Sequence, residues 1–142
     1  MRIIVDSNII ISSLIKDSIN RHLIASFDVL FYYPEEALDE IIRNKGEILE
    51  KGKISEQEFQ VILTTLFKYI RIIKKEDLQS YIKEADRIIG NIHKNDVIFI
   101  AAALAKNAII WSNDTHFQKQ KDIFVITTKD IINNYRKIIE KM

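Results

Sequence analysis

The chain has 142 residues, no cysteine and a formal net charge of +1. This length suits one domain with a sizeable core, and the missing cysteines exclude disulfides, thiolate zinc sites and a cysteine nucleophile. The near-neutral charge excludes a chain-wide attraction to nucleic acid. Because the sequence shows neither a leader with a cleavage site nor an apolar run of membrane-spanning length, we expect a single domain over residues 1–142 that is soluble and cytoplasmic.

The first apolar run of the chain ends on a carboxylate. Residues 3–5 are Ile-Ile-Val, which favours a strand buried on both faces, and Asp6 follows directly. In an open α/β sheet, ligands bind at the carboxyl ends of the strands, so Asp6 is a candidate for metal binding or ion pairing. The alternative is that Asp6 only caps the helix expected over residues 8–16.

Helices and strands then alternate. Ser18 is expected to cap a helix that ends near residue 25, residues 29–32 to form the second strand, and Pro34 to begin a helix that ends near residue 44. In this last helix, Asp39 and Glu40 lie on the two flanks of the apolar stripe. Periodicity therefore nominates one of these two acids to face the protein and does not choose between them.

The second half of the chain continues this alternation. Gly46 and Gly52 bracket a charged connection, and Ser55 with Glu58 predicts a capping box at the start of the next helix. The later elements are expected at residues 56–67 (helix), 69–73 (strand), 77–89 (helix), 97–105 (helix), 108–112 (strand), 124–127 (strand) and 128–141 (helix). The pattern predicts an α/β fold, a three-layer α/β/α sandwich with a central parallel five-stranded sheet.

Two further aspartates stand at element ends. Asp96 precedes nine successive apolar residues, where it could be only a helix cap, and Asp114 follows the fourth strand. With right-handed crossovers, Asp6 and Asp114 open on the same edge of the sheet, where helices also begin. Converging carboxylates repel one another unless cations bind between them, and an all-oxygen site suits Mg²⁺ or Mn²⁺. The acids therefore predict metal-assisted chemistry on phosphate.

Other side chains were candidates for contact with a substrate. His116 could contact a phosphate or donate a proton, although a surface histidine in a loop is the simpler interpretation. Trp111 lies inside an apolar strand and is expected in the core rather than in a base-stacking platform. Lysines in residues 45–53, 74–75 and 119–121 could form a local basic rim or only a solvated face.

Four short motifs resemble those of the PIN-domain ribonucleases, a family that includes the toxins of many prokaryotic toxin–antitoxin pairs. The motifs are Ile-Val-Asp-Ser-Asn at 4–8, Leu-Asp-Glu-Ile at 38–41, Asn-Asp-Val-Ile-Phe-Ile-Ala at 95–101 and Trp-Ser-Asn-Asp-Thr-His-Phe at 111–117. The resemblance implies that the metal-binding acids are Asp6, Glu40, Asp96 and Asp114. It also implies that Asn8 is a polar helper that orients the first aspartate or its water.

The chain departs from the commonest family pattern at two positions. Ser7 stands where threonine is frequent, which keeps the hydroxyl, and His116 stands where many members have a further acid. The second change leaves a second metal site less certain than the first.

By this resemblance we expect a Mg²⁺- or Mn²⁺-dependent endoribonuclease, in which a metal-activated water leaves a 5′-phosphate and a 3′-hydroxyl. The expected partners are RNA, an antitoxin encoded next to this chain, and a second copy in a homodimer. Two alternatives stay open: a catalytically silent PIN-fold module for binding or assembly, and a DNA-directed or structure-specific nuclease.

Overall fold

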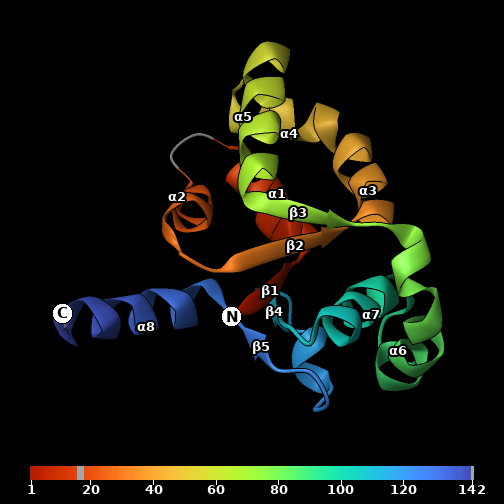
Figure 1. Ribbon diagram of the computed structural model, residues 1–142. Coiled ribbons are helices and arrows are strands. Elements are labelled where there is room, and N and C mark those ends of the chain that lie inside the picture. The colour runs from red at the N-terminus through yellow and green to blue at the C-terminus, as the bar shows by residue number, and fades with distance from the viewer. Residues whose placement is uncertain (16–17, 142) are drawn as a thin grey trace.

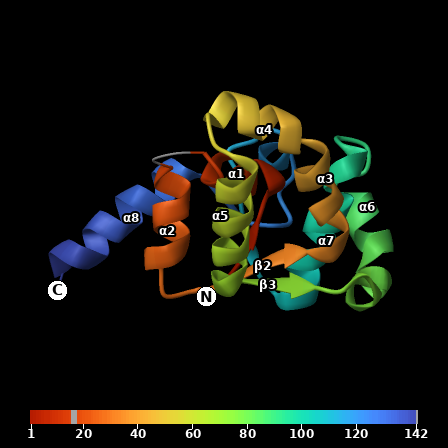
Figure 2. The same ribbon diagram turned by 90° about the horizontal axis from the view of Figure 1, so that it is seen from above.

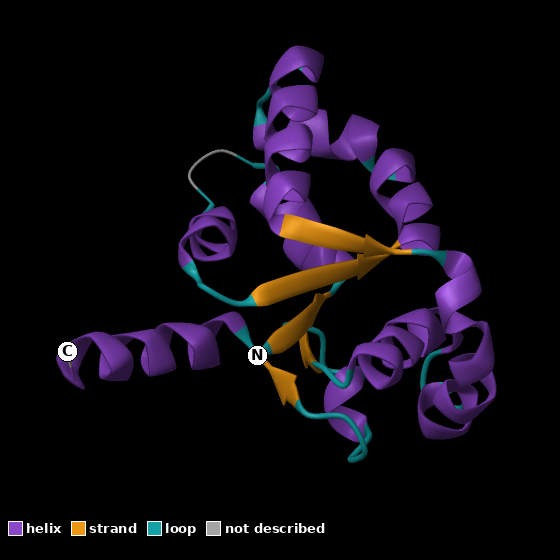
Figure 3. Ribbon diagram, in the orientation of Figure 1, coloured by secondary structure: helices purple, strands orange, loops and turns teal. Residues whose placement is uncertain are grey.

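A parallel sheet of five strands forms the centre of the molecule (Figures 1 and 3). The computed structural model describes residues 1–15 and 18–141, with side chains described as far as residue 134. The strand order is β3-β2-β1-β4-β5, and every neighbouring pair is parallel. The strands are β1 (Arg2–Val5), β2 (Leu30–Pro34), β3 (Ile70–Ile73), β4 (Ile109–Trp111) and β5 (Val125–Ile126). The predicted five-stranded parallel sheet is confirmed.

Helices cover both faces of this sheet (Figures 1 and 2). The helices are α1 (Ser7–Ser13), α2 (Ile19–Ser26), α3 (Leu38–Arg43), α4 (Lys45–Gly52), α5 (Glu56–Tyr69), α6 (Ile82–Ile89), α7 (Val97–Lys106) and α8 (Thr128–Lys141). On one face α7 packs against β1, β2 and β4, with α6 against α7, whereas α1 to α5 lie on the other. The arrangement is the expected α/β/α sandwich, and α8 extends away from it.

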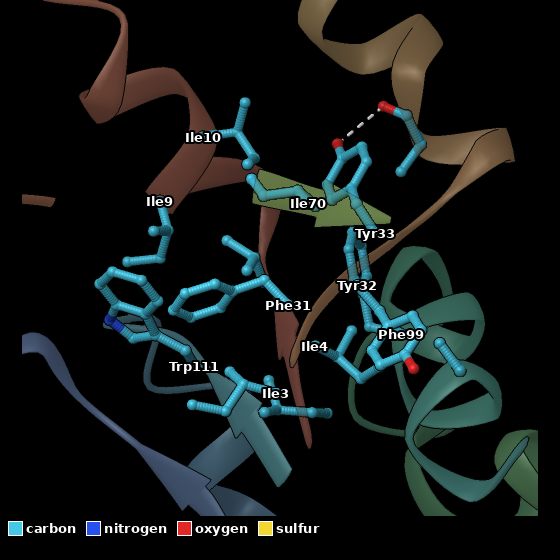
Figure 4. Packing of buried hydrophobic residues seen from close by; sticks show 14 of the residues in the cluster. Ile3, Ile4, Ile9, Ile10, Phe31, Tyr32, Tyr33, Ile70, Phe99 and Trp111 are labelled. Atoms are coloured by element: carbon cyan, nitrogen blue, oxygen red, sulfur yellow. Dashed lines mark hydrogen bonds between the residues drawn. The ribbon is translucent and has the colours of Figure 1, made fainter. Parts of the chain in front are cut away.

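The central strand is buried because both of its neighbours and both helical layers cover it. Ile3, Ile4 and Val5 are at most 1% exposed, as the continuous apolar run predicts. Figure 4 shows Trp111 beside Phe31, with their ring centroids 6.0 Å apart. The expectation that Trp111 belongs to the core is confirmed, since its side chain is fully buried.

Helix α7 is apolar on nearly all sides because it lies between the sheet and α6. The buried residues of its middle are Phe99, Ile100, Ala101, Ala102 and Ala103. Small alanine side chains let the helix approach the strands closely. The prediction of a central, all-apolar helix after Asp96 is confirmed.

The predicted helix over residues 34–44 begins later than expected. Pro34 is the last residue of β2, where it pairs with Ile73, and its ψ of 135° is extended. Residues Glu35–Ala37 form a 3₁₀ turn before α3. The fixed φ of proline suits an extended residue as well as a first helical residue, so the strand pairing decides. A 3₁₀ turn, Lys75–Tyr81, also precedes α6 where one helix over residues 77–89 was expected.

The prediction of a charged connection between Gly46 and Gly52 is wrong, because this segment forms helix α4. Within α4 the side chain of Ile48 is buried, and Glu47 forms an ion pair with Lys51 one turn later. The end of the first helix also differs: α1 stops at Ser13, and residue 16, the predicted end, lies outside the described residues. By contrast, the capping box of Ser55 and Glu58 is present as predicted.

None of the helices described is both long and apolar enough to cross a membrane.

Thr128, the first residue of α8, connects β4 to two helices. Its hydroxyl accepts hydrogen bonds from Trp111 Nε1 at 3.1 Å and Asn113 Nδ2 at 3.0 Å, and donates one to Asn20 Oδ1 at 2.9 Å. Asn20 in turn donates to Ser12 Oγ of α1. The backbone N–H of Thr128 also donates to Asn113 Oδ1 at 2.9 Å. The loop after β4 is therefore tied to the start of α8.

We expect the Thr128→Val variant to lower the free energy of unfolding by about 1–3 kcal/mol, because it leaves the partly buried partners of the hydroxyl without a hydrogen bond. Thr64→Val is the matched control, since Thr64 is an exposed residue of α5. Urea denaturation of the three proteins measures the difference. Equal losses in both variants would show that the hydroxyl of Thr128 has no special role.

Candidate metal centre

The carboxyl ends of the strands open into a pocket of about 430 Å³. The five residues nominated from the sequence and the family resemblance all line it: Asp6, Asn8, Glu40, Asp96 and Asp114. Asp39 is exposed and is not part of the lining, so the choice that periodicity left open falls on Glu40. The structure thus places these side chains together, while their roles as ligands and catalysts stay a prediction.

Asp6 is held by the neighbouring strand rather than by its own helix. It precedes α1, but its side chain forms no helix cap. Instead, Ser112 Oγ donates to Asp6 Oδ2 at 2.8 Å and accepts the backbone N–H of Asp114 at 2.9 Å. Ser112 therefore links the acid after β1 to the acid after β4, and the alternative that Asp6 only caps a helix is wrong.

Asp6 lies in surroundings that disfavour a negative charge. Burial, together with the charges of Asp96 and Asp114, raises the pKa of Asp6 to about 7 against the opposing hydrogen bond from Ser112. The carboxyl group therefore takes up a proton near neutral pH unless a cation neutralises it. This is the behaviour expected of an acid that is built to bind a metal ion.

Asp96 stands at the start of α7 without capping it. Burial raises the pKa of Asp96, the charges of Asp114 and Glu40 act in the same direction, and those of His93 and His116 oppose them. Its Oδ2 atom is buried and makes no hydrogen bond to any described residue. The interpretation of Asp96 as only a cap is therefore wrong, and its Oδ2 atom stays without a hydrogen bond at the pocket.

Asp114 differs from the other acids because a local turn satisfies part of it. Its Oδ1 atom accepts the backbone N–H of His116 at 2.9 Å. The imidazole Nδ1 of the same histidine lies 3.1 Å from that oxygen. One oxygen of Asp114 is thus engaged within its own loop, which suits it to a supporting role.

Two histidines lie beside Asp96. His93 Nδ1 is 3.3 Å and His116 Nδ1 is 3.7 Å from Asp96 Oδ2, and the two rings are stacked with centroids 4.3 Å apart. His116 lies in a turn and its side chain is 36% exposed, as expected of a surface histidine in a loop, but its ring also lies beside two of the acids. His93 was not singled out from the sequence, although its position three residues before Asp96 places both side chains on one side of the turn that opens α7.

The spacing of the acids fits hydrated cations better than one bare ion. Among the described residues, His93, Asp96 and His116 are the only group of three or more metal-ligating side chains whose ligand atoms all lie within 4.8 Å of one another. The four carboxylates are spread more widely around the pocket. Mg²⁺ usually keeps several waters and binds through one or two carboxylates, so the residues present fit such an ion.

The hydroxyl of Ser7 takes part in a buried chain of hydrogen bonds next to the pocket acid Asp6. It lies 2.6 Å from the hydroxyl of Tyr33, which donates to the backbone carbonyl of Ala37 at 2.9 Å (Figure 4). This chain of hydrogen bonds joins the start of α1 to the turn that leads into α3, the helix of Glu40. Serine at position 7 therefore keeps the polar function that threonine would have.

Comparisons with known proteins agree with this geometry. The family model described as "PIN domain" matches residues 4–133. Among solved structures, the chain is similar to one of VapBC2 from Rickettsia felis bound to a DNA fragment from their promoter, with a TM-score of 0.66 and 21% sequence identity, over 89% of this chain and 98% of that chain. At this identity the likeness shows a shared fold. No sequence among curated proteins matches the chain.

The raised pKa of Asp6 makes the stability of the metal-free protein depend on pH. The folded chain holds this proton up to a pKa of about 7, against 3.8 for an ordinary aspartate. Protonation of Asp6 therefore stabilises the folded state fully below pH 3.8, and this stabilisation is lost as the pH rises to 7. A pKa shift of about three units corresponds to about 4 kcal/mol of unfolding free energy. With EDTA present, we expect the stability of Asp6→Asn relative to wild type to rise between pH 5 and pH 8.

Denaturant titrations at several pH values measure this difference. Asp39→Asn, which removes an exposed carboxyl outside the pocket, is the matched control. A stability difference between Asp6→Asn and wild type that stays constant from pH 5 to pH 8 would contradict the raised pKa.

Proposed function

Because the chain belongs to the PIN-domain family, we propose that it is a toxin-like, divalent-metal-dependent endoribonuclease. The observation that carries this proposal is the convergence of Asp6, Glu40, Asp96 and Asp114 on one pocket from four different parts of the chain. Neither Asp6 nor Asp96 serves as a helix cap, and burial disfavours the charge of both. A pocket of this kind stabilises the fold only when cations share it.

The proposed ligands divide into two groups. Asp6, Glu40 and Asp96 would hold the principal cation, Mg²⁺ or Mn²⁺, and Asp114 would contribute to a second cation or position a water. When bound, such cations neutralise phosphate oxygens and supply an activated water, so no serine, cysteine or histidine nucleophile is needed. Asn8, exposed at the mouth of the pocket, would orient Asp6 or the attacking water.

Cationic side chains at the pocket support a phosphate-bearing substrate. Arg43 and Lys94 line it, whereas of the lysine clusters expected to form a rim only Lys51 lines a hollow beside the acids, the second one described next. A second hollow, of about 500 Å³, shares Asn8 and Glu40 with the first and continues over α1 and α4. The two hollows together offer a polynucleotide a path past the acids, and the phosphates of the chain would be held by Arg43 and Lys94.

We include protein partners in the proposal. The similar structure from Rickettsia felis is of VapBC2 bound to a DNA fragment from their promoter, a fold likeness that agrees with a toxin-type assembly. An antitoxin encoded next to this chain is therefore expected, together with a homodimer of the chain itself. Co-expression with the neighbouring gene product, followed by sizing of the complex, tests both expectations.

The nuclease proposal predicts metal-dependent cleavage that requires the pocket acids. We expect Asp96→Asn and Glu40→Gln to lower kcat by about 100-fold or more, because the cations that these acids hold supply several kcal/mol of stabilisation to the transition state. Asp39→Asn, on the same helix as Glu40 but exposed, is expected to keep full activity. EDTA should abolish cleavage and Mn²⁺ should restore it.

Cleavage of labelled single-stranded and structured RNA, with DNA of the same sequence as competitor, measures these effects. Equal traces of cleavage in wild type and both acid variants would indicate a silent PIN module contaminated by another nuclease. Preferential cleavage of the DNA would instead support the DNA-directed alternative.

The placement of Lys94 predicts a salt-dependent contribution to RNA binding. In the Asp6→Asn background, which keeps the RNA intact, Lys94→Gln should weaken binding and lower the slope of log affinity against log salt by about 0.7, the value for one phosphate contact on a single strand. Lys83→Gln, at an exposed position of α6, is the control. Fluorescence anisotropy measures both slopes between 50 and 200 mM salt, a range over which affinities that depend on phosphate contacts change strongly. Identical slopes for the two variants would remove Lys94 from the binding path.

A further inference from the structure

The cluster of His93, Asp96 and His116 contains three buried ligand atoms that make no hydrogen bond, although the rings lie within ion-pair distance of Asp96 and Asp114. Neither imidazole Nδ1 atom, nor Asp96 Oδ2 between them, has a hydrogen-bond partner among the described residues. A buried polar atom without a hydrogen bond destabilises the folded chain, so three at one point need an explanation. Ion pairing of both histidines with Asp96 is a poor one, because two positive rings would then be stacked at 4.3 Å.

The distances within the cluster are those of neighbouring ligands around a small metal ion. A tetrahedral ion with bonds of about 2.0–2.2 Å separates its ligand atoms by about 3.3–3.6 Å. The observed separations from Asp96 Oδ2 are 3.3 Å to His93 Nδ1 and 3.7 Å to His116 Nδ1. A ligand atom from each of the three residues can be chosen so that all three lie within 4.8 Å of one another.

The exposure of both rings leaves them room to aim their lone pairs at such an ion. At present they are stacked with an interplanar angle of 18°, and in-plane lone pairs require the two rings to open from this stack. The side chains of His93 and His116 are 37% and 36% exposed, so each ring can turn toward solvent without displacing the core.

We propose that His93, Asp96 and His116 form a binding position for a first-row transition-metal dication of the Zn²⁺ class. Imidazole nitrogen suits such ions, whereas Mg²⁺ takes oxygen ligands, so this position differs in chemistry from the carboxylate centre with which it shares Asp96. Three protein ligands leave a fourth position open toward the pocket. Metal binding here rests on these residues alone; a role for the metal in cleavage rests on the proposed function.

Under the proposed function, the position offers this chain a second metal site. His116 and His93 stack on each other, and both lie beside Asp96. The second cation would then be selected by nitrogen ligands rather than by oxygen alone. The chain would accordingly bind two cations of different preference in one pocket.

The test follows the imidazole signals of the three histidines by ¹H–¹⁵N correlation NMR in metal-stripped protein without RNA. Zn²⁺ is expected to shift the ligating nitrogens of His93 and His116 and to leave His22, an exposed residue of α2, unchanged. Mg²⁺ is expected to produce no ligation shift in any of them. Equal responses of all three histidines to Zn²⁺, or no response, would overturn the inference.

Calorimetric titration with Zn²⁺ gives the second readout. We expect His93→Gln and His116→Gln each to weaken Zn²⁺ binding at least about tenfold, because loss of even a hydrogen-bond partner of a metal ligand has an effect of that size. His22→Gln is expected to have no effect. Unchanged affinity in folded His93→Gln and His116→Gln would overturn the proposal. Should either variant fail to fold, the NMR result on the wild-type chain decides.

A further variant separates this inference from the nuclease proposal. Asp6 is not part of the histidine cluster, so Asp6→Asn should retain Zn²⁺ binding while losing RNA cleavage. A chain that binds Zn²⁺ through the histidines but cleaves no RNA would refute only the nuclease proposal. A chain that cleaves RNA with Mg²⁺ and shows no histidine ligation would refute only the zinc position.

Discussion

Repulsion among carboxylates at one edge of the sheet is the constraint on which the site depends. The parallel order of β2, β1 and β4 brings strand ends together, and Asp6 and Asp114 follow two of them. The hydroxyl of Ser112 bonds the carboxylate of Asp6 and the backbone N–H of Asp114, which joins the two strand ends. Burial disfavours the charge of Asp6, and stability alone would favour a neutral side chain there. The carboxylate is therefore not explained by the stability of the fold, which agrees with its proposed role as a metal ligand.

The sheet and the central helix could be predicted because their apolar runs are continuous. Residues 3–5 and the stretch after Asp96 are covered on all sides, and such burial leaves a clear signature in the sequence. Helix α4 carries no comparable signature, since a single buried isoleucine and pairs of charged side chains define it. The start of α3 was misplaced because Pro34 suits a strand end as well as a helix start, and only the pairing of β2 with β3 distinguishes them.

The acids of the site could be nominated from the sequence, but not their surroundings. Periodicity left Asp39 and Glu40 equal, and only the position of α3 against the pocket separates them. The contact of His93 with His116 is invisible in the sequence, because the two residues are far apart along the chain and meet only when the loop after β4 reaches the start of α7. In the same way, Arg43 reaches the pocket although it belongs to none of the basic clusters.

Hydrogen bonds couple α8 to the loop that follows β4. The helix extends away from the sheet, and its first residue, Thr128, is bonded twice to Asn113, the neighbour of Asp114. Because Thr128 is hydrogen-bonded to Asn113, a movement of the start of α8 would also displace the loop that carries Asp114. A partner that binds α8 would therefore also act on the geometry of the candidate metal centre.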